Sequence, residues 1–457
     1  MADPFLLSHS CAPFQFTFAG PLTPVSIRDQ MIRGKMFADR AIEQRIISRD
    51  RDLLVTGAGA GGVTAAIRAA QLGVKTTLVE ASPQAFGRQK NCTTRWVDPT
   101  QYDWPADHWD RAKYPWTPPA VPLPWSAQLS APIAAVWERE LRRALQRYKN
   151  LQFLPQSTVV SIAYRPATRD LAIALNTRSG AITRVYGAAL HCIGFGTERA
   201  SSGTYSSFQF WDSDPLELPQ LGLPSKPQSV LICGGGDGAL QDFLRITTGT
   251  KSAGDLFRTL PSKAREMVTP AIYSAEDQAQ RAGTWCEKHH EHAVFSRLHQ
   301  VHNNQVQQVL TDPATAPGVS QALDGALQHA QGLEILLAHP CDHFSRCYAL
   351  NRFLTLLVLA HAQANAIPIV RVPWTGVGSV IGIGHTCANN PGYCHGKQHK
   401  VQLQSAPTCK TGPTGTPIVT SDFQVVILRL GVNAPAPFAN NSPLLITRQI
   451  LPYHASQ

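Results

Sequence analysis

The most regular stretch of the chain begins with a short apolar run, Leu53 to Thr56, of the length of a buried strand. A segment with helical spacing follows, in which Ala66 and Ala70 are small enough for close packing and Gly73 marks the end. A second apolar run, Val74 to Val79, comes next. Strand, helix and strand in this order predict a βαβ unit with two parallel strands.

Other segments differ in pattern and predict other elements. A helix with one apolar side is expected around Ile27 to Ile47, and it should pack on the βαβ unit. Alternation from Leu151 to Tyr186 predicts a small antiparallel sheet. The polar residues 243–330 predict a helical insertion, and residues 343–372 predict a long core helix followed by a buried strand. Phe423 to Gly431 is typical of a late strand and turn.

Glycines and one acid of the βαβ unit have the spacing of a dinucleotide site. Gly57, Gly59 and Gly62 form G-x-G-x-x-G directly after the first strand, and Gly61 lies among them. Such glycines allow a tight turn, close approach of a pyrophosphate to the backbone, and close packing of the helix, whose first N–H groups face the phosphates. Glu80 ends the second strand, where its carboxylate can accept the ribose hydroxyls. The alternative, a glycine turn without a ligand, does not explain this complete spacing.

This spacing resembles the FAD-binding fingerprint of the two-dinucleotide-binding-domain flavoproteins, which include thioredoxin-reductase-like and flavin-monooxygenase-like enzymes. Ala188 to Glu198, with Gly194, is similar to the strand and turn that lead the chain out of the FAD domain. Ser229 to Asp242 is similar to the G-G-G-D-S-A turn that holds NADPH in these proteins, although Gly238 replaces the serine. The resemblance implies FAD as the cofactor. It implies NADPH or NADH as a second nucleotide, held by Gly234, Gly236, Asp237 and Gly238.

The chain departs from this family in three ways. It contains no Cys-x-x-Cys, so it lacks the dithiol of the disulfide reductases. The family returns to its FAD domain at the end of the chain with a strand and a Gly-Asp pair, and the residues after Gly431 contain no such pair. The acid or arginine expected at the end of the next strand of the second nucleotide unit is not found in the polar stretch after Asp242.

We therefore predict an α/β protein with two Rossmann-like dinucleotide-binding domains, each a parallel sheet flanked by helices, with a small antiparallel β layer and a helical insertion. The expected divisions are an N-terminal lead-in with a helix (1–51), an FAD-binding domain (52–215) that includes an aromatic, Pro-rich loop (95–125), a second, NAD(P)-binding-like domain (226–435) with the helical insertion (243–330), and a C-terminal tail (436–457).

The aromatic, Pro-rich loop contains too much proline for a regular helix or a central strand. It is either a lid that lines a pocket or an irregular segment fixed to the domain surface by its aromatic side chains. If it lines a pocket, we expect at least two of its tryptophans to face a cavity beside the Gly57 to Gly62 turn, with Arg88 or Arg95 placed to meet an anionic group. The four candidates are Trp96, Trp104, Trp109 and Trp116.

Composition supports a folded protein of more than one domain. The chain has 457 residues, of which 43% are hydrophobic and 16% are charged, which is enough to form two or three α/β cores. Its formal net charge is +10, but lysine and arginine are dispersed. The most basic helix, Glu138 to Lys149, includes acids and is typical of a solvated face. We therefore expect a small-molecule substrate and no nucleic acid.

The remaining features indicate the environment of the protein. The N-terminus has no basic region followed by an apolar run, and no segment has 18 consecutive apolar residues, so neither a signal nor a membrane span is expected. Ten scattered cysteines favour reduced thiols in the cytoplasm. Two histidine and cysteine clusters, at 286–292 and 387–409, lack the paired spacing of zinc sites, so no metal is predicted.

Two functional hypotheses remain open. The first is an FAD-dependent oxidoreductase that acts on a small molecule, as a monooxygenase or an amine-type oxidase, and is reduced by NAD(P)H or directly by its substrate. The second is a non-catalytic dinucleotide-binding protein, a sensor or partner that has lost part of the flavin site. The sequence identifies no catalytic residue, substrate or oligomeric state.

Overall fold

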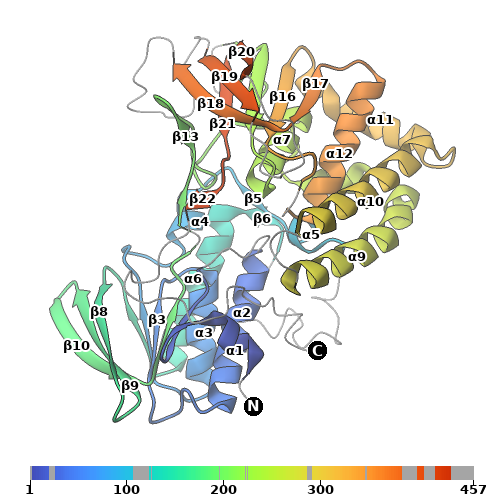
Figure 1. The fold of residues 1–457 in the computed structure, drawn as a ribbon. Coiled ribbons are helices and arrows are strands. Elements are labelled where there is room, and N and C mark those ends of the chain that lie inside the picture. Colours follow the sequence, from blue (N-terminus) through green and yellow to red (C-terminus); the bar gives the residue numbers. More distant parts are fainter. Residues whose placement is uncertain are drawn as a thin grey trace. The chain divides into compact units, whose positions relative to one another are not determined.

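The computed structural model describes residues 3–19, 26–105, 123–124, 126–194, 196–221, 223, 225–285, 291–344, 347–382, 399–405 and 417–433 (Figure 1). The chain forms two compact units. Unit 1 consists of Met1–Thr93, Asp107–Thr197 and Val432–Gln457, and unit 2 consists of Thr94–Ala106 and Glu198–Gly431. In the part of the chain that is described, no helix is long and apolar enough to cross a membrane.

Unit 1 is built on a six-stranded sheet in which all neighbours but the first pair are parallel. Its order is β1 (Ser10–Ala12), β2 (Gln15–Thr17), β11 (Ala188–His191), β3 (Leu53–Thr56), β4 (Thr76–Val79) and β7 (Leu151–Leu154). Helix α3 (Ala60–Gln71) connects β3 and β4, which confirms the predicted βαβ unit. The apolar runs are strands because every residue of β3, β4 and β11 is buried.

The N-terminal segment is part of unit 1. Strand β2 pairs in parallel with β11. After α1 (Pro4–His9) and β2, helix α2 (Ile27–Glu43) begins with a capping box, in which the Asp29 N–H donates to Ser26 and the Ser26 N–H donates to Asp29. Helix α2 packs on α3.

A three-stranded antiparallel sheet covers part of unit 1. Its order is β10 (Gly180–Tyr186), β9 (Asp170–Thr177) and β8 (Thr158–Arg165), as the alternating pattern predicted, whereas residues 151–154 form β7 of the parallel sheet instead. Leu171, Ile173 and Leu175 of β9 are buried against the parallel sheet at Leu54 and Ala189. The helices α4 (Gly87–Asn91) and α6 (Ser130–Arg147) complete the unit, with β6 (Gln128–Leu129) before α6.

Unit 2 is built on a four-stranded parallel sheet with the order β17 (Ile369–Pro373), β16 (Glu334–His339), β15 (Ser229–Cys233) and β21 (Val425–Leu428). The predicted helical insertion lies between β15 and β16. It contains α7 (Asp237–Thr248), α8 (Ala253–Thr259), α9 (Ser262–Trp285), α10 (Glu291–Thr311), α11 (Ala316–Leu327) and η3 (Gln328–Ala330). Helix α12 (Ala349–Ala364) starts later than predicted, because its N-cap Tyr348 is held by a hydrogen bond to Asp237.

A second antiparallel sheet, which the pattern did not predict, belongs to unit 2. It contains β18 (Thr375–Gly382), β19 (His399–Ser405) and β20 (Pro417–Phe423). Val380, Val401 and Leu403 of this sheet share a core with Leu231 and Val426 of the parallel sheet. Four further short elements lie in unit 2: β5 (Trp96–Val97), α5 (Pro99–Asp103), β13 (Ser201–Ser202) and β14 (Tyr205–Ser206). Strand β12 (Thr197–Glu198) spans the boundary, and β22 (Val432–Asn433) belongs to unit 1.

The domain boundaries differ from the prediction in two places. Residues 94–106, the start of the aromatic, Pro-rich loop, belong to unit 2, and so do residues 198–215. Trp104 explains the first difference, because its ring packs on Phe257 and Phe353, with centroids 5.0 and 5.7 Å away, and its indole N–H donates to Thr269 at 3.3 Å. Residues 106–122, Trp125 and the predicted tail 436–457 lie outside the described residues.

Candidate functional site

The turn after β3 requires glycine at two positions. Gly57 has a φ of +93°, and a Cβ there would collide with the Cys192 carbonyl oxygen. A Cβ on Gly62 would collide with the Gly57 carbonyl oxygen. The turn, the start of α3 and the residue after β11 therefore lie in backbone contact, as the spacing of the glycines predicted.

Gly59 differs, because open space lies beside it. No described atom lies within 4 Å of the position that a Cβ would take at Gly59. Gly59 is the N-cap of α3, and no described side chain caps this helix. Uncapped N–H groups at the start of a 12-residue helix, beside open space, form the arrangement that binds a pyrophosphate. Gly61 instead faces α2, where a Cβ would lie 3.0 Å from the Gln30 carbonyl oxygen.

Glu80 lies directly after β4 and reaches back to the turn. One carboxylate oxygen accepts the Ala58 N–H at 2.7 Å and the other accepts the Ser82 N–H at 2.9 Å. A carboxylate oxygen has more than one lone-pair direction, so these bonds leave capacity for ribose hydroxyls. Glu80 thus fixes the turn and remains able to bind an adenosine ribose. This second role stays a prediction.

Arg88 and Gly194 lie on the segments that flank the turn. The Phe86 N–H, just before α4, donates to the Ala58 carbonyl at 2.9 Å, so α4 starts beside the turn. Arg88 is exposed and donates to the Gly196 carbonyl at 3.2 Å. Gly194 has a φ of +81° and an open side. Arg88 and Gly194 thus flank the turn, and their role in cofactor binding stays a prediction.

Helix α2 brings residues to this turn that the sequence analysis did not identify. A Cβ on Gly34 would collide with the Gly61 carbonyl oxygen, so α2 and α3 touch along their backbones. Arg33, the residue before Gly34, is fully buried and hydrogen-bonds His9 and Gln30. Burial lowers the pKa of Arg33 to about 10 and holds that of His9 well below its usual value, so His9 is neutral and accepts. The packing of α2 on α3 and the burial of Arg33 depend on long-range contacts, so no local sequence pattern could have revealed them.

The turn after β15 repeats these features in unit 2. Gly234 has a φ of +141°, and a Cβ there would collide with the Arg429 carbonyl oxygen. Gly236 is the N-cap of α7, which no described side chain caps. A Cβ on Gly236 would meet no described atom within 4 Å. The second turn can therefore also accept a phosphate at its middle glycine.

Two residues predicted to hold the second nucleotide have other contacts. The carboxylate of Asp237 is buried and accepts the Tyr348 N–H at 2.7 Å and the Asn351 amide at 2.8 Å, so it positions α12. A Cβ on Gly238 would lie 3.3 Å from side-chain atoms of Phe210 and Arg429. Asp237 and Gly238 thus contact other parts of unit 2, and their role in holding the second nucleotide stays a prediction.

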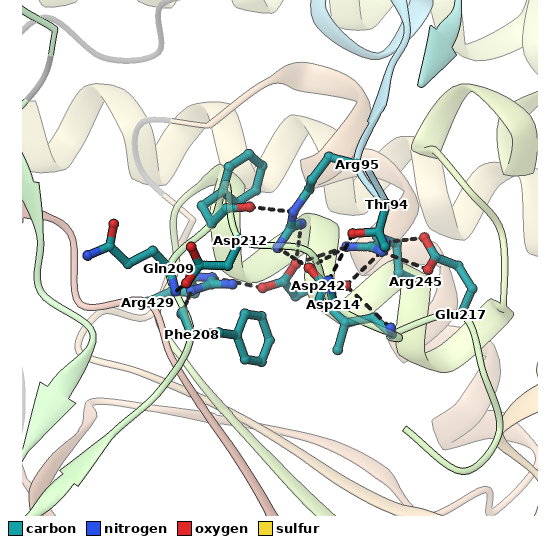
Figure 2. A network of polar contacts seen from close by, with 12 residues as sticks. Thr94, Arg95, Phe208, Gln209, Asp212, Asp214, Glu217, Asp242, Arg245 and Arg429 are labelled. Carbon is teal, nitrogen blue, oxygen red and sulfur yellow. Dashed lines mark hydrogen bonds and ion pairs between the residues drawn. The ribbon is translucent and has the colours of Figure 1, made fainter. Parts of the chain in front are cut away.

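A buried network of ion pairs supports the second turn (Figure 2). Asp242 of α7 forms ion pairs with Arg429 at 2.8 Å and with Arg95 at 2.5 Å. Asp214 forms ion pairs with Arg95 at 3.1 Å and with Arg245 at 2.8 Å. Burial alone would raise the pKa of Asp242, but Arg429 and Arg95 lower it. Arg95 therefore belongs to this network in unit 2, and Arg88 is the one of the two candidate arginines that lies in unit 1 with the Gly57 turn.

The remaining expectations for the loop and the metal clusters fall largely outside the described residues. Trp109 and Trp116 are among the residues that are not described, as are 286–290, 387–398 and Cys409. Trp104 lies in unit 2, where its ring packs on Phe353. The described residues contain no group of three or more His, Cys, Asp or Glu side chains that could hold a metal, and the described cysteines form no disulfide.

Comparison with known proteins adds one family. The family model "FAD dependent oxidoreductase" matches residues 52–109. No curated protein matches the chain. Solved structures similar to the chain include thioredoxin reductase from Lactococcus lactis (12% identity, TM-score 0.36, 85% of this chain and 80% of that one) and bacillithiol disulfide reductase from Bacillus cereus (10%, 0.40, 83% and 78%). Ornithine hydroxylase from Pseudomonas aeruginosa is a third (12%, 0.36, 85% and 84%).

The geometry of the first turn fits the cofactor of that family. The open side of Gly59, the uncapped start of α3 and the carboxylate of Glu80 provide space for a pyrophosphate, donors for its oxygens and an acceptor for a ribose. The resemblance of Gly57 to Glu80 to an FAD-binding fingerprint is thus confirmed by the family match. The family match thus covers the βαβ unit that contains this turn, and it supports a flavin-dependent enzyme with FAD as its cofactor.

Proposed function

We propose that the protein uses NADPH or NADH to reduce FAD. The reduced flavin would then pass its electrons to O2, so that one oxygen atom enters a small molecule and the other leaves as water, as in a flavin monooxygenase. The observation that carries this proposal is the presence of two open glycine turns, at Gly59 and Gly236, each at the carboxyl edge of its own parallel sheet. Ligands of open α/β sheets bind at this edge.

The residues of the chain have distinct tasks in this proposal. The first turn of α3 binds the FAD pyrophosphate, and Glu80 binds the adenosine ribose while holding Ala58 in place. The first turn of α7 binds the pyrophosphate of the second nucleotide. Bound FAD supplies the redox chemistry by taking up a hydride and passing electrons on. The protein orients both nucleotides and excludes water.

The absence of a Cys-x-x-Cys from the sequence favours this reaction class over disulfide reduction, because no dithiol can pass electrons from the flavin to a disulfide. An amine-type oxidase is the second candidate within the flavoenzymes. It would take electrons from its substrate and would need no nicotinamide nucleotide. The second open turn at Gly236 favours the monooxygenase.

A non-catalytic dinucleotide-binding protein is the candidate from another class. The lack of a Gly-Asp pair at the end of the chain supports it.

The absorption spectrum of the purified protein tests the proposal. We expect the bands of oxidised flavin at close to one FAD per chain, and we expect NADPH or NADH to bleach them without air. A colourless protein that does not take up added FAD would favour the non-catalytic reading. A yellow protein that is bleached by amines but by neither nucleotide would identify the oxidase.

A further inference from the structure

The two nucleotide turns differ at one equivalent position. Thr56, the last residue of β3, pairs with Val79, and Glu80 comes next. Cys233, the last residue of β15, pairs with Ala338, and His339 comes next. The two positions, Glu80 and His339, also match in lying against their turns. Glu80 accepts the Ala58 N–H in the first turn. In the second, a Cβ on Gly235 would lie 3.3 Å from the His339 imidazole. An imidazole therefore occupies the place of the ribose-binding carboxylate.

Arg371 of the neighbouring strand β17 holds this imidazole. Its Nε donates to His339 Nε2 at 2.8 Å, and one terminal nitrogen lies 3.4 Å from His299 Nε2. The other terminal nitrogen donates to the Asp342 carbonyl, and the guanidinium lies 4.8 Å from the centre of the Phe344 ring. Among the described residues, no carboxylate forms an ion pair with Arg371.

The protonation states leave the positive charge of this cluster on Arg371. Burial, assisted by Arg371, lowers the pKa of His299 to about 2 and holds that of His339 well below its usual value, so both rings are neutral. His339 accepts from Arg371 through Nε2, whereas His299 accepts the Phe344 N–H through Nδ1. Burial lowers the pKa of Arg371 to about 10, which still leaves it charged at neutral pH. A partly buried guanidinium with neutral partners binds a phosphate strongly, since charge-assisted hydrogen bonds are the strong ones.

We infer that the second turn selects NADPH over NADH, and that Arg371 is the residue that meets the 2′-phosphate. This inference rests on the proposed function. A carboxylate at the end of the second strand accepts the ribose hydroxyls of an unphosphorylated nucleotide and repels a phosphate there. His339 removes that carboxylate, and Arg371 supplies a cation at the same edge of the sheet. Helix α7 binds the pyrophosphate at the adjacent Gly236.

Asp342 is the group that opposes this selection. Its side chain is 40% exposed, and one carboxylate oxygen lies 2.5 Å from Nδ1 of His343. If Asp342 turned its second oxygen to the nucleotide, it would bind the ribose hydroxyls and favour NADH. The experiment therefore includes a variant at this position.

Calorimetric titration of the full-length protein with adenosine 2′,5′-bisphosphate and with 5′-AMP tests the inference, because these probes differ by the 2′-phosphate alone. We expect the bisphosphate to bind about 10-fold more tightly or better, the ratio that one charge-assisted contact provides. Arg371→Gln should reduce the ratio to nearly one without weakening 5′-AMP, and Arg371→Lys should restore part of it. Arg297→Gln, which removes an equal charge from an exposed site on α10, should leave the ratio unchanged.

Two results would overturn the inference. One is equal binding of the two probes, or a preference that survives in the folded Arg371→Gln variant. The other is tighter binding of 5′-AMP that Asp342→Asn abolishes, which would assign the site to NADH. The titration needs no flavin, so a yellow protein that does not discriminate refutes this inference alone. A colourless protein that discriminates through Arg371 refutes the proposed flavin enzyme alone.

Discussion

The Gly57–Gly62 turn and the Gly234–Ala239 turn share a backbone plan but are supported differently. In both, the first glycine has a positive φ and packs on the residue after a flanking parallel strand, Cys192 in unit 1 and Arg429 in unit 2. Each of these residues donates its N–H to the strand that precedes the turn, at 2.7 and 2.8 Å. Both turns are open at the middle glycine.

The two turns differ in the contacts that hold them in place. The first turn is enclosed by backbone, since Gly34 and Gly61 let α2 and α3 touch and Gly62 touches Gly57. The second has Ala239 in place of Gly62, and its flanking Arg429 is held by ion pairs with Asp242 (Figure 2). The first turn should therefore respond to side-chain volume, and the second to charge and pH.

Gly59→Val should give the largest effect. The new side chain would meet no described protein atom within 4 Å of its Cβ, so the protein should fold, but the branched side chain would occupy the pyrophosphate site. We expect FAD affinity to fall ~100-fold or more, as an overpacked site predicts. Flavin content after gel filtration, with circular dichroism as the check on folding, measures this. A folded variant with one FAD per chain would refute the assignment of the turn.

Gly236→Val is the matched change in the second turn. Its Cβ is also open, so we expect FAD to stay bound while reduction by NADPH or NADH slows by ~100-fold or more. Anaerobic stopped-flow bleaching of the flavin measures the rate. Unchanged bleaching would mean that Gly236 is structural and that the two turns do not share a function.

The sequence predicted the first turn well because everything that forms it is local. Gly57, Gly59, Gly62 and Glu80 lie within one βαβ unit, and each residue type follows from its place in that unit. The helical insertion was also predictable, since its polar composition is a property of the segment itself.

The features that the sequence did not predict depend on distant contacts. His339 lies beside the second turn in space but far from it in the sequence, because the insertion α7–α11 separates β15 from β16. A search of the residues just after Asp242 could therefore not find it. Arg95 and Trp104 lie in a segment that interrupts unit 1 in the sequence, but they belong to unit 2, where they contact Asp242 and Phe353. Likewise, no local pattern shows that β2 pairs with β11.

Asp242→Asn tests whether charge supports the second turn. The change leaves Arg429 and Arg95 buried without their shared carboxylate, which costs about 3–5 kcal/mol in buried ion-pair networks. We expect urea unfolding to show this loss, and Asp422→Asn, at an exposed site on β20, to show little. If the two variants are equally stable, the network does not stabilise unit 2.

Asp237→Asn should have the smallest effect, and it depends on pH. Burial raises the pKa of Asp237 to about 7, so the folded state binds a proton that the unfolded state releases near its ordinary pKa. The free energy of unfolding should therefore decline as pH rises from about 4 to 7 and then level off. Asparagine can accept the same two hydrogen bonds without a charge, so the variant should flatten this decline and gain stability relative to the wild type above pH 7. Melting temperatures between pH 4.5 and 8 measure it. Parallel curves for the two proteins would show that Asp237 does not titrate in this range.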